Sequence, residues 1–324
     1  MKILAIEHFT AFDPESSLAC EGLAMLLAVA RDLAGLPDVR VAVAVKRAES
    51  LTDSLVEPFL VEETPPGEWS RAASSFDGVL VIAPEMNRIA TELVMRLEIA
   101  GAKLLSPPAR FVEWASDKLA VARFLPAISP PTNGACASSG DFVVKPRDGV
   151  GCLATAFVEG SRLTDATTAI RRSGFDGELI VQPRVVGQAM SVAIVGRKGK
   201  KPIILPAAEQ RIEETVNTKV PTFRSLTYQG GRLPIDGVED RVASLIASLW
   251  NAVEPFDGWF GVDFILADDG RDVIVDVNPR VTTSYLGYSR LLPGAAARLL
   301  VGRETADDVA RVAGPFDVQV EFGL

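Results

Sequence analysis

Two neighbouring apolar stretches near the C-terminal end of the chain each carry one acidic residue. Asp263 stands within FGVDFILA and Asp276 within DVIVDVN, and both stretches are typical of buried strands. A buried polar group without a partner costs roughly 2–7 kcal/mol, and two carboxylates close together also repel each other. A bound cation would remove both penalties. The pattern therefore predicts two paired strands whose acids share a cation.

The second stretch adds an amide to these two acids. Asp276 and Asn278 are two residues apart, so their side chains lie on the same face of one strand. With Asp263 they form a set of three hard oxygen ligands, which suits Mg²⁺ completed by waters and phosphate oxygens. The alternative is that these acids cap turns or face solvent. We assign that simpler role to Asp268, Asp269 and Asp272 in the polar turn between the stretches.

The N-terminal part shows an alternation of strands and helices. Strands are predicted at 2–7, 39–45 and 76–84, and helices at 17–34 and about 86–100. This order is typical of a parallel α/β sheet, and we place the first domain at 1–105. The full length of 324 residues favours two or three lobes.

Composition excludes several classes of function. The net charge of −9 argues against nucleic acid or an anionic membrane as the main partner. No apolar stretch reaches ~18 residues, and the start of the chain lacks the features of a signal peptide. The three cysteines show no disulfide or zinc pattern, so a cytoplasmic protein is expected. His8 is the only histidine, which excludes a multi-histidine metal site.

A glycine loop at GVGCLA, residues 149–154, matches the dinucleotide fingerprint. That fingerprint needs a helix directly after the glycines, whereas the following residues resemble a strand. A glycine loop between two antiparallel strands instead suits backbone contacts to nucleotide phosphates, although a plain hairpin turn is the simpler alternative. Lys145 precedes the loop, and Lys118 follows a predicted helix start capped by Ser116. Both lysines are candidates for neutralising phosphates, although each alone would be read as a surface residue.

The stretch ELIVQPRVVG is an apolar strand interrupted by a proline. Backbone groups at its exit, around Gln182, Pro183, Arg184 and Val185, are free to read an adenine ring. The alternative is an ordinary edge strand. Residues 212–237 are polar and are predicted to form a substrate loop.

In order and spacing, these motifs resemble the ATP-grasp superfamily of carboxylate–amine ligases, over residues 106–300. The resemblance implies an α/β protein with an ATP-grasp fold behind an N-terminal Rossmann-like pre-ATP-grasp domain. It implies a small lobe at 106–181 and a large lobe at 182–324 that clamp ATP. Family members are often dimers, so a homodimer is expected.

The resemblance also implies roles for individual residues. Lys118, Lys145 and the backbone at Gly149 and Gly151 would contact ATP phosphates, and Gln182–Val185 would face adenine. Asp263, Asp276 and Asn278 would hold two Mg²⁺ ions, for which Mn²⁺ is expected to substitute. Arg280 would steady the transferred phosphoryl group. One departure concerns the ribose, because the glutamate usual in the family is replaced at Gln188 or Ala189.

Within the superfamily, SLACEGLAML at 17–26, YQGG at 228–231 and NPRVTTSY resemble tyramine–L-glutamate ligases of methanofuran and methylofuran synthesis. This resemblance implies that the γ-carboxylate of glutamate is activated by ATP and attacked by the amine of tyramine. Arg211, Arg224, Thr282 and Ser284 would orient glutamate, and Phe223 and Tyr228 would pack on the phenol. The alternatives are a ligase or carboxylase for other substrates, a regulatory ATP-binding protein without turnover, and a nicotinamide oxidoreductase.

Overall fold

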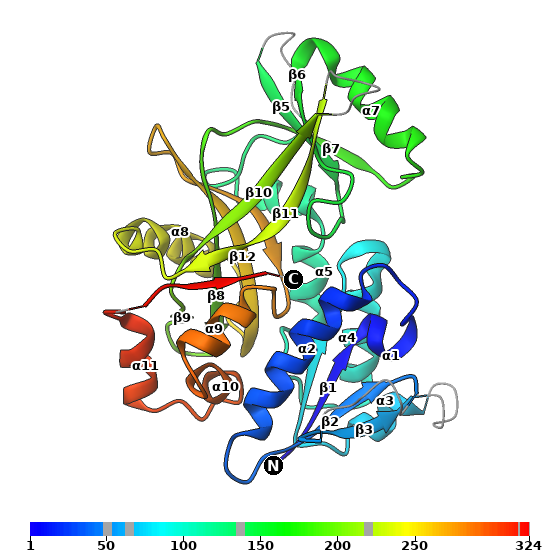
Figure 1. Cartoon of the computed structure of the whole chain (residues 1–324), viewed down its shortest axis with the longest axis vertical. Helices are drawn as coiled ribbons and strands as arrows, with labels where there is room; N and C mark the ends of the chain where they lie inside the picture. Colours follow the sequence, from blue (N-terminus) through cyan, green and yellow to red (C-terminus); the bar gives the residue numbers. More distant parts are fainter. Residues whose placement is uncertain (48–53, 62–67, 134–139, 217–222, 317, 324) are drawn as a thin grey trace.

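The computed structural model describes the whole chain except residues 48–53, 62–67, 134–139, 217–222, 317 and 324. Figure 1 shows a small lobe at the top, a large lobe at the left and an N-terminal domain at the lower right. No helix in the described part of the chain is both long and apolar enough to cross a membrane.

The N-terminal domain is built on a parallel four-stranded sheet with the order β3-β2-β1-β4. β1 and β4 are buried almost throughout, as expected for strands covered on both faces by helices. The strands are β1 (Lys2–Glu7), β2 (Arg40–Val45), β3 (Glu57–Leu60) and β4 (Gly78–Ile82). The helices are α1 (His8–Phe12), α2 (Ala19–Ala34), α3 (Trp69–Ala73), the short η2 (Met86–Arg88) and α4 (Ile89–Ile99).

Two short helices lead into the next part of the chain, α5 (Ala109–Ala115) and α6 (Lys118–Phe124). The prediction that Ser116 caps the second helix was wrong by one residue. Asp117 has extended backbone angles, and its carboxylate accepts hydrogen bonds from the backbone N–H groups of Leu119 and Ala120, both at 3.0 Å. Ser116 ends α5 instead and donates its hydroxyl to the Val112 carbonyl.

The two lobes share one large sheet with the order β13-β12-β8-β10-β11-β6-β5-β7, in which all pairs are antiparallel. β9 adds to β8, and β14 adds to β11. The strands are β5 (Asp141–Pro146), β6 (Ala156–Glu159), β7 (Leu179–Pro183), β8 (Gly187–Gly196), β9 (Ile203–Ile204), β10 (Ala208–Val216), β11 (Phe223–Leu233), β12 (Gly258–Ala267), β13 (Val273–Asn278) and β14 (Val320–Phe322).

Helices cover both parts of this sheet. The short η3 (Gly160–Arg162) and α7 (Leu163–Arg172) lie on β5 and β6 in the small lobe. The large lobe carries α8 (Glu239–Ala252), α9 (Tyr285–Leu291), α10 (Ala295–Leu300) and α11 (Ala306–Ala313). The predicted divisions after residues 105 and 181 remain proposals.

Residues 212–237 are not the loop that their polar composition predicted. β10 and β11 form a long antiparallel hairpin that reaches from the large lobe to the small lobe (Figure 1). Residues 217–222 between them lie outside the described part. The outer half of β10 is mostly exposed, and cross-strand pairs such as Arg224–Glu214 stabilise it. The polar residues of β10 and β11 therefore reflect a solvent-exposed two-stranded ribbon.

The backbone after the glycine loop excludes the dinucleotide fingerprint, which needs a helix at that point. No helix follows Gly151; residues 151–154 form turns, and β6 starts at Ala156. The expectation of a loop between two antiparallel strands was correct, because β5 pairs directly with β6.

The N-terminal domain is packed firmly against the large lobe. Leu26, Val29 and Leu33 of α2 belong to the same buried core as Tyr285 and Leu292. This packing fixes the carboxyl ends of β1 and β4 beside the end of β13. In open parallel sheets these carboxyl ends are where ligands bind.

The start of α11 gives a prediction on stability. Asp308 is buried, makes a bidentate ion pair with Arg298 and completes a capping box with Thr305. Asp308→Asn is expected to lower the unfolding free energy by about 2 kcal/mol at pH 7, because a cap and a charge-assisted pair are lost. Thermal unfolding measures the change, with the exposed Asp307→Asn as control.

The same pair predicts a pH dependence. Arg298 and the Thr305 hydrogen bonds hold the pKa of Asp308 well below its usual range. The folded pKa is thus lower than the unfolded value of about 3.9, so the stabilisation is present above about pH 4 and is lost as pH falls further. The stability gap between wild type and Asp308→Asn should therefore narrow below pH 4; a constant gap down to pH 2.5 would contradict this.

Candidate active site

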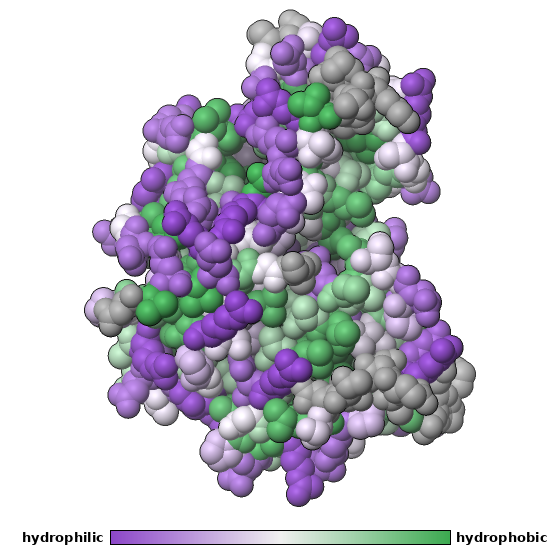
Figure 2. Space-filling model, viewed as in Figure 1, coloured by the Kyte–Doolittle hydropathy of each residue, from purple (hydrophilic) through white to green (hydrophobic). Residues whose placement is uncertain are grey.

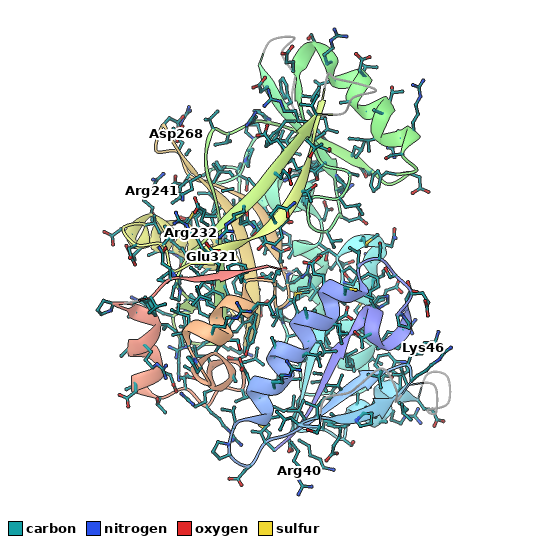
Figure 3. The ribbon with its side chains drawn as sticks, viewed as in Figure 1. Arg40, Lys46, Arg232, Arg241, Asp268 and Glu321 are labelled. Carbon is teal, nitrogen blue, oxygen red and sulfur yellow. The ribbon has the colours of Figure 1, made fainter. Side chains whose placement is uncertain are left out.

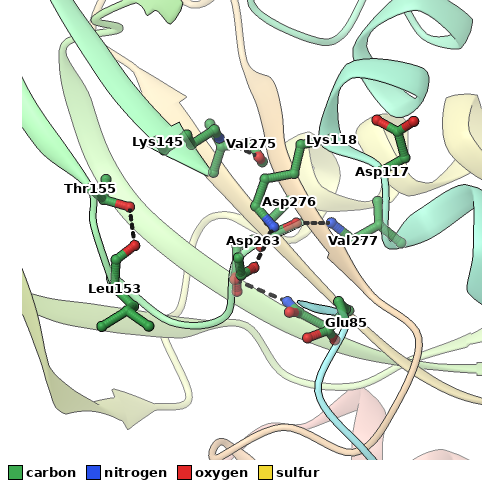
Figure 4. A network of polar contacts seen from close by, with 12 residues as sticks. Glu85, Asp117, Lys118, Lys145, Leu153, Thr155, Asp263, Val275, Asp276 and Val277 are labelled. Atoms are coloured by element: carbon green, nitrogen blue, oxygen red, sulfur yellow. Dashed lines mark hydrogen bonds and ion pairs between the residues drawn. The ribbon is translucent and has the colours of Figure 1, made fainter. Parts of the chain in front are cut away.

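The two buried acids predicted to share a cation face each other. In the antiparallel β12–β13 pair, Asp263 stands directly opposite Asp276, so both side chains lie on the same face. The Asn278 amide donates a hydrogen bond of 3.0 Å to the second oxygen of Asp263. A one-residue irregularity follows at Val275, where the register shifts between Asp263 and Phe264. Figure 4 shows this group from close by.

The electrostatics of the pair favour a bound cation. Burial, and after it the neighbouring charge of Asp276, raises the pKa of Asp263 to about 7, although hydrogen bonding to Asn278 and the charge of Lys118 oppose the shift. Gln210 donates a second hydrogen bond to Asp263, at 3.0 Å. A divalent cation would remove both the burial penalty and the repulsion.

The donor set fits Mg²⁺. It consists of two carboxylates and one amide oxygen, which are hard ligands on neighbouring strands. Within the described ranges, no three His, Cys, Asp or Glu side chains converge to hold an ion by themselves. Phosphate oxygens and waters would have to supply the remaining ligands, as is usual for Mg²⁺ bound with a nucleotide.

Both predicted lysines reach this group from the other side of the cavity. Lys118 donates 2.9 Å hydrogen bonds to the Asp276 carboxylate and to the Gly149 carbonyl, and its side chain is 7% exposed. Lys145 donates at 2.8 Å to the carbonyl of Val275, the residue at the strand irregularity (Figure 4). Two ammonium groups therefore stand beside the two carboxylates.

The environment lowers the affinity of Lys145 for its proton. Burial, the largest cause, and the charge of Lys118 lower its pKa to about 8, although the charges of Asp276 and Asp263 oppose the shift. Two lysines held close together in a desolvated cavity attract an anion strongly. This arrangement suits an anionic ligand such as a phosphate group.

The glycine loop covers the same cavity and gives a prediction. A Cβ at Gly149 would lie 2.6 Å from the Cβ of Pro146, which is closer than real Cβ atoms approach. Gly149→Ala should therefore shift the loop and the carbonyl that holds Lys118. We expect the KM for ATP to rise about tenfold, equivalent to ~1.4 kcal/mol of binding. Steady-state ATP titration measures it.

The control for this variant is Gly35→Ala at the end of α2, where a Cβ would meet only ordinary contacts at 3.5 Å. An unchanged KM for ATP in Gly149→Ala would show that the loop does not approach the phosphates.

Arg280 is held by a residue from the N-terminal domain. Its guanidinium makes two hydrogen bonds, at 2.9 and 3.2 Å, to the two carboxylate oxygens of Glu85, just after β4. Glu85 is 2% exposed and Arg280 14% exposed, so this is a buried interdomain pair. Burial, the largest single effect, lowers the pKa of Arg280, but the charge and hydrogen bonds of Glu85 together with the charges of Glu21 and Asp276 raise it above the usual value, so Arg280 stays cationic. Nearby, the hydroxyls of Thr282 and Ser284 lie 2.8 Å apart.

A cavity of about 220 Å³ joins these groups to the segment after β7. Arg184 of that segment lies over the Phe157 ring at 4.0 Å. The Gln182 amide donates to the Thr132 hydroxyl at 2.7 Å. Apolar side chains around the Gln182–Val185 end of the cavity can enclose a flat ring. The cavity is lined by Lys118, Lys145, Gly149, Gly151, Gln182–Val185, Asp263, Asp276, Asn278, Arg280, Thr282 and Ser284, and its apolar walls include Val143, Phe157, Ile212, Leu226 and Ile265.

Of the predicted substrate residues, Tyr228, Thr282 and Ser284 line the cavity, whereas Arg211 and Arg224 do not. Arg211 pairs with Glu321, and Arg224 with Glu214, on the exposed hairpin. Figure 3 shows Glu321 next to Arg232, its partner across the β11–β14 pair. The structure therefore does not bring these two arginines to the site. The Phe223 side chain lies outside the described part.

Two other predictions can be placed. Gln188 and Ala189, the two positions where the resemblance would place the ribose-binding glutamate, do not line the cavity, and Gln188 donates to Glu209. The turn acids have the simple roles assigned to them: Asp269 pairs with Arg271, and Asp272 pairs with Arg241. Figure 3 shows Arg241 and Asp268 at the outer end of the large lobe.

Three polar residues of the site were not predicted from the sequence. They are Glu85, which pairs with Arg280, Gln210, which donates to Asp263, and Glu21, which accepts a 2.8 Å hydrogen bond from Thr283. The position of Glu85 in the sequence could have indicated that it belongs to the site. It stands just beyond a predicted parallel strand, at the sheet edge where ligands bind.

The chain matches two known domain families. A family described as "ATP-grasp domain" matches residues 115–284, and one described as "pre ATP-grasp 3 domain" matches residues 40–112. A search of curated proteins gave no match.

Solved structures agree in fold. A protein from Archaeoglobus fulgidus, described as belonging to the ATP-grasp superfamily, is 22% identical with a TM-score of 0.69, over 94% of this chain and 89% of that one. VanG D-Ala:D-Ser ligase from Enterococcus faecalis is 15% identical, TM-score 0.68, over 93% and 98%. The biotin carboxylase domain of 2-oxoglutarate carboxylase from Hydrogenobacter thermophilus, in complex with MgADP, ADP and bicarbonate, is 12% identical, TM-score 0.70, over 98% and 73%.

The family match spans more than half of the chain, and the solved structures share the arrangement of both lobes and the domain before them. The chain belongs to the ATP-grasp family and carries a pre-ATP-grasp domain ahead of its ATP-grasp domain.

Proposed function

We propose that the protein is an ATP-dependent, ADP-forming ligase that joins a carboxylate to an amine through an acyl phosphate. The observation that carries this proposal is the convergence of Lys118 and Lys145 with Asp263, Asp276 and Arg280 in one cavity. The three cationic side chains suit an anionic triphosphate and a carboxylate, and the two carboxylates suit a metal ion. The chain has a single histidine, which suits a reaction without a histidine-activated nucleophile on the enzyme.

The reaction has two steps. A substrate carboxylate oxygen attacks the γ-phosphorus of ATP, and ADP leaves, giving an acyl phosphate. The amine nitrogen then attacks the acyl carbon, phosphate leaves with the original carboxylate oxygen, and the nitrogen loses a proton to give the amide. Lys118 and Lys145 neutralise the ATP phosphates, and Arg280 stabilises charge on the transferred phosphoryl group.

Asp263, Asp276 and Asn278 would hold two Mg²⁺ ions, for which Mn²⁺ would substitute. The bound metal would neutralise charge on the phosphates during transfer. Asn278 would turn its amide oxygen toward a metal, because it now donates to Asp263 through its nitrogen. Gln182–Val185 would accommodate the adenine.

For substrates we propose the γ-carboxylate of L-glutamate and the amine of tyramine, which would place the protein in methylofuran-type cofactor synthesis. This choice rests on the resemblance of residues 17–26 and 228–231 to tyramine–L-glutamate ligases. Two placements support it: Tyr228 lines the cavity, and the Thr282 and Ser284 hydroxyls lie beside Arg280. The shared fold with a D-Ala:D-Ser ligase also supports the use of amino-acid substrates.

The test is an incubation of the purified protein with ATP, Mg²⁺, L-glutamate and tyramine, with ADP release and product masses as readouts. ADP formed only with both substrates, together with the mass of γ-glutamyltyramine, is the expected result. ADP formed with another amine or carboxylate would keep the ligase and exclude these substrates. Tight ATP binding without ADP formation for any pair would favour a regulatory ATP-binding protein.

A further inference from the structure

A second cavity lies beside the ATP cavity. It measures about 540 Å³ and is enclosed by α2, the carboxyl ends of β1 and β4, the glycine loop and β11. Glu21, Tyr228 and Arg280 line both cavities, so the two spaces meet at these residues. Figure 2 shows apolar surface in the hollow between the upper lobe and the lower domain. Residues 182–185, proposed to face adenine, line only the first cavity, whereas a molecule in the second cavity would still reach Arg280.

The charged groups of this cavity are mostly acidic. Among the described residues that line it, the charged side chains are Glu7, Glu21 and Arg280, and Arg280 already pairs with Glu85. Arg280 is therefore the one cationic side chain among these described lining residues, and the charge of Glu85 offsets it. The net negative charge favours a cationic occupant.

The two glutamates differ in what their oxygens can still accept. Glu7 is 2% exposed. Its oxygens accept hydrogen bonds from the Phe9 and Thr10 backbone N–H groups and from the Thr10 hydroxyl, so they are already occupied. Glu21 is half-buried and accepts from Thr283 through one oxygen. Within the described part of the chain, its other oxygen has no hydrogen-bond donor, so it is available to a ligand.

The remaining walls are apolar. Phe9, Leu18, Met25 and Ile82 surround the end of the cavity away from Arg280. An occupant therefore needs one cationic end beside Glu21 and an apolar body among these side chains. Burial of such a body is favourable by about 25 cal/mol per Å² of apolar surface.

We propose that this second cavity is the acceptor-amine subsite, in which Glu21 binds the ammonium group of a primary amine with an apolar or aromatic body. The assignment rests on the proposed ligase function. It places the amine nitrogen where the two cavities meet, next to the acyl phosphate that Arg280 would stabilise. The ammonium is recognised by a charged hydrogen bond, and the body by shape and apolar contact.

Equilibrium binding tests the subsite without turnover. The experiment is isothermal titration of the intact protein with tyramine, phenethylamine and hexylamine. Each amine is compared with the alcohol that has a hydroxyl in place of the ammonium. We expect the amines to bind wild type at least about tenfold more tightly than the alcohols, and Glu21→Gln to remove that preference. Glu15→Gln, an exposed neighbour on the same segment, should bind like wild type.

A second variant guards against an indirect effect of the charge change. Leu18→Trp fills the apolar end and should weaken the aromatic amines about tenfold while leaving ATP binding unchanged. The subsite is excluded if none of the amines binds wild type, if Glu21→Gln binds them as tightly as wild type does, or if it weakens glutamate binding instead.

These outcomes are separable from the proposed function. Glu21-dependent amine binding without any amide product would retain the subsite and exclude the ligase. Amide formation with a KM for the amine that is unchanged in Glu21→Gln would retain the ligase and exclude the subsite.

Discussion

Asp276→Asn is expected to lower kcat for ATP-dependent ligation by on the order of 10²- to 10³-fold, the loss typical of removing one group that stabilises transition-state charge. Asp276 serves two partners, because it faces the proposed metal position together with Asp263 and accepts a 2.9 Å contact from Lys118. Asparagine keeps the shape but removes the charge that both partners need. Apparent Mg²⁺ affinity should fall as well, by about 10–100-fold.

Steady-state kinetics over a range of Mg²⁺ concentrations measures both effects. Excess Mg²⁺ should restore part of the ATP affinity of Asp276→Asn. It should not restore kcat, because the missing charge acts in the transition state. Asp269→Asn, exposed in the turn of the same hairpin, is the matched control and should behave like wild type. An Asp276→Asn enzyme with half of the wild-type kcat at saturating Mg²⁺ would exclude the proposed metal site.

Arg280→Gln is expected to lower both activity and stability, by separable routes. The activity loss should be about 10²- to 10³-fold in kcat, because a fixed cation beside the phosphoryl group is removed. The stability loss arises because Glu85, which is 2% exposed, is left as an unpaired buried charge. Breaking a buried pair in this way costs about 3–5 kcal/mol.

The double variant Glu85→Gln/Arg280→Gln separates the two effects. It has no unpaired charge, so its thermal midpoint should return most of the way to wild type while kcat remains low. Glu85→Gln alone keeps the arginine and should retain more activity than either variant lacking Arg280. Recovery of activity in the double variant would show that Arg280 acts only through folding.

The strand pair at the centre of the site was predictable because its physics is local. Asp263 and Asp276 interrupt runs that burial otherwise demands to be apolar, and alternation along the strand places Asn278 on the same face. The pairing of β12 with β13 brings these residues together as the pattern indicated. Lys118 and Lys145 were found through their spacing from the glycine loop.

The interdomain partners could not be predicted in this way. Glu85 lies 195 residues from Arg280, and Glu21 lies 262 residues from Thr283. No local periodicity encodes such contacts, because they depend on how α2 packs against α9 and α10. The hairpin of β10 and β11 was missed for a different reason. Its residues are polar because the ribbon is solvated, and strand formation there follows from cross-strand pairing.

The central claim is that a carboxylate oxygen attacks the γ-phosphate in the cavity between the lobes. Glutamate labelled with ¹⁸O in its γ-carboxylate, incubated with ATP, Mg²⁺, tyramine and the protein, tests it by ³¹P NMR of the released phosphate. The proposed reaction predicts one ¹⁸O in each phosphate, formed in step with ADP and amide. Unlabelled phosphate accompanying amide formation, or phosphate release that does not depend on glutamate, would contradict the acyl phosphate.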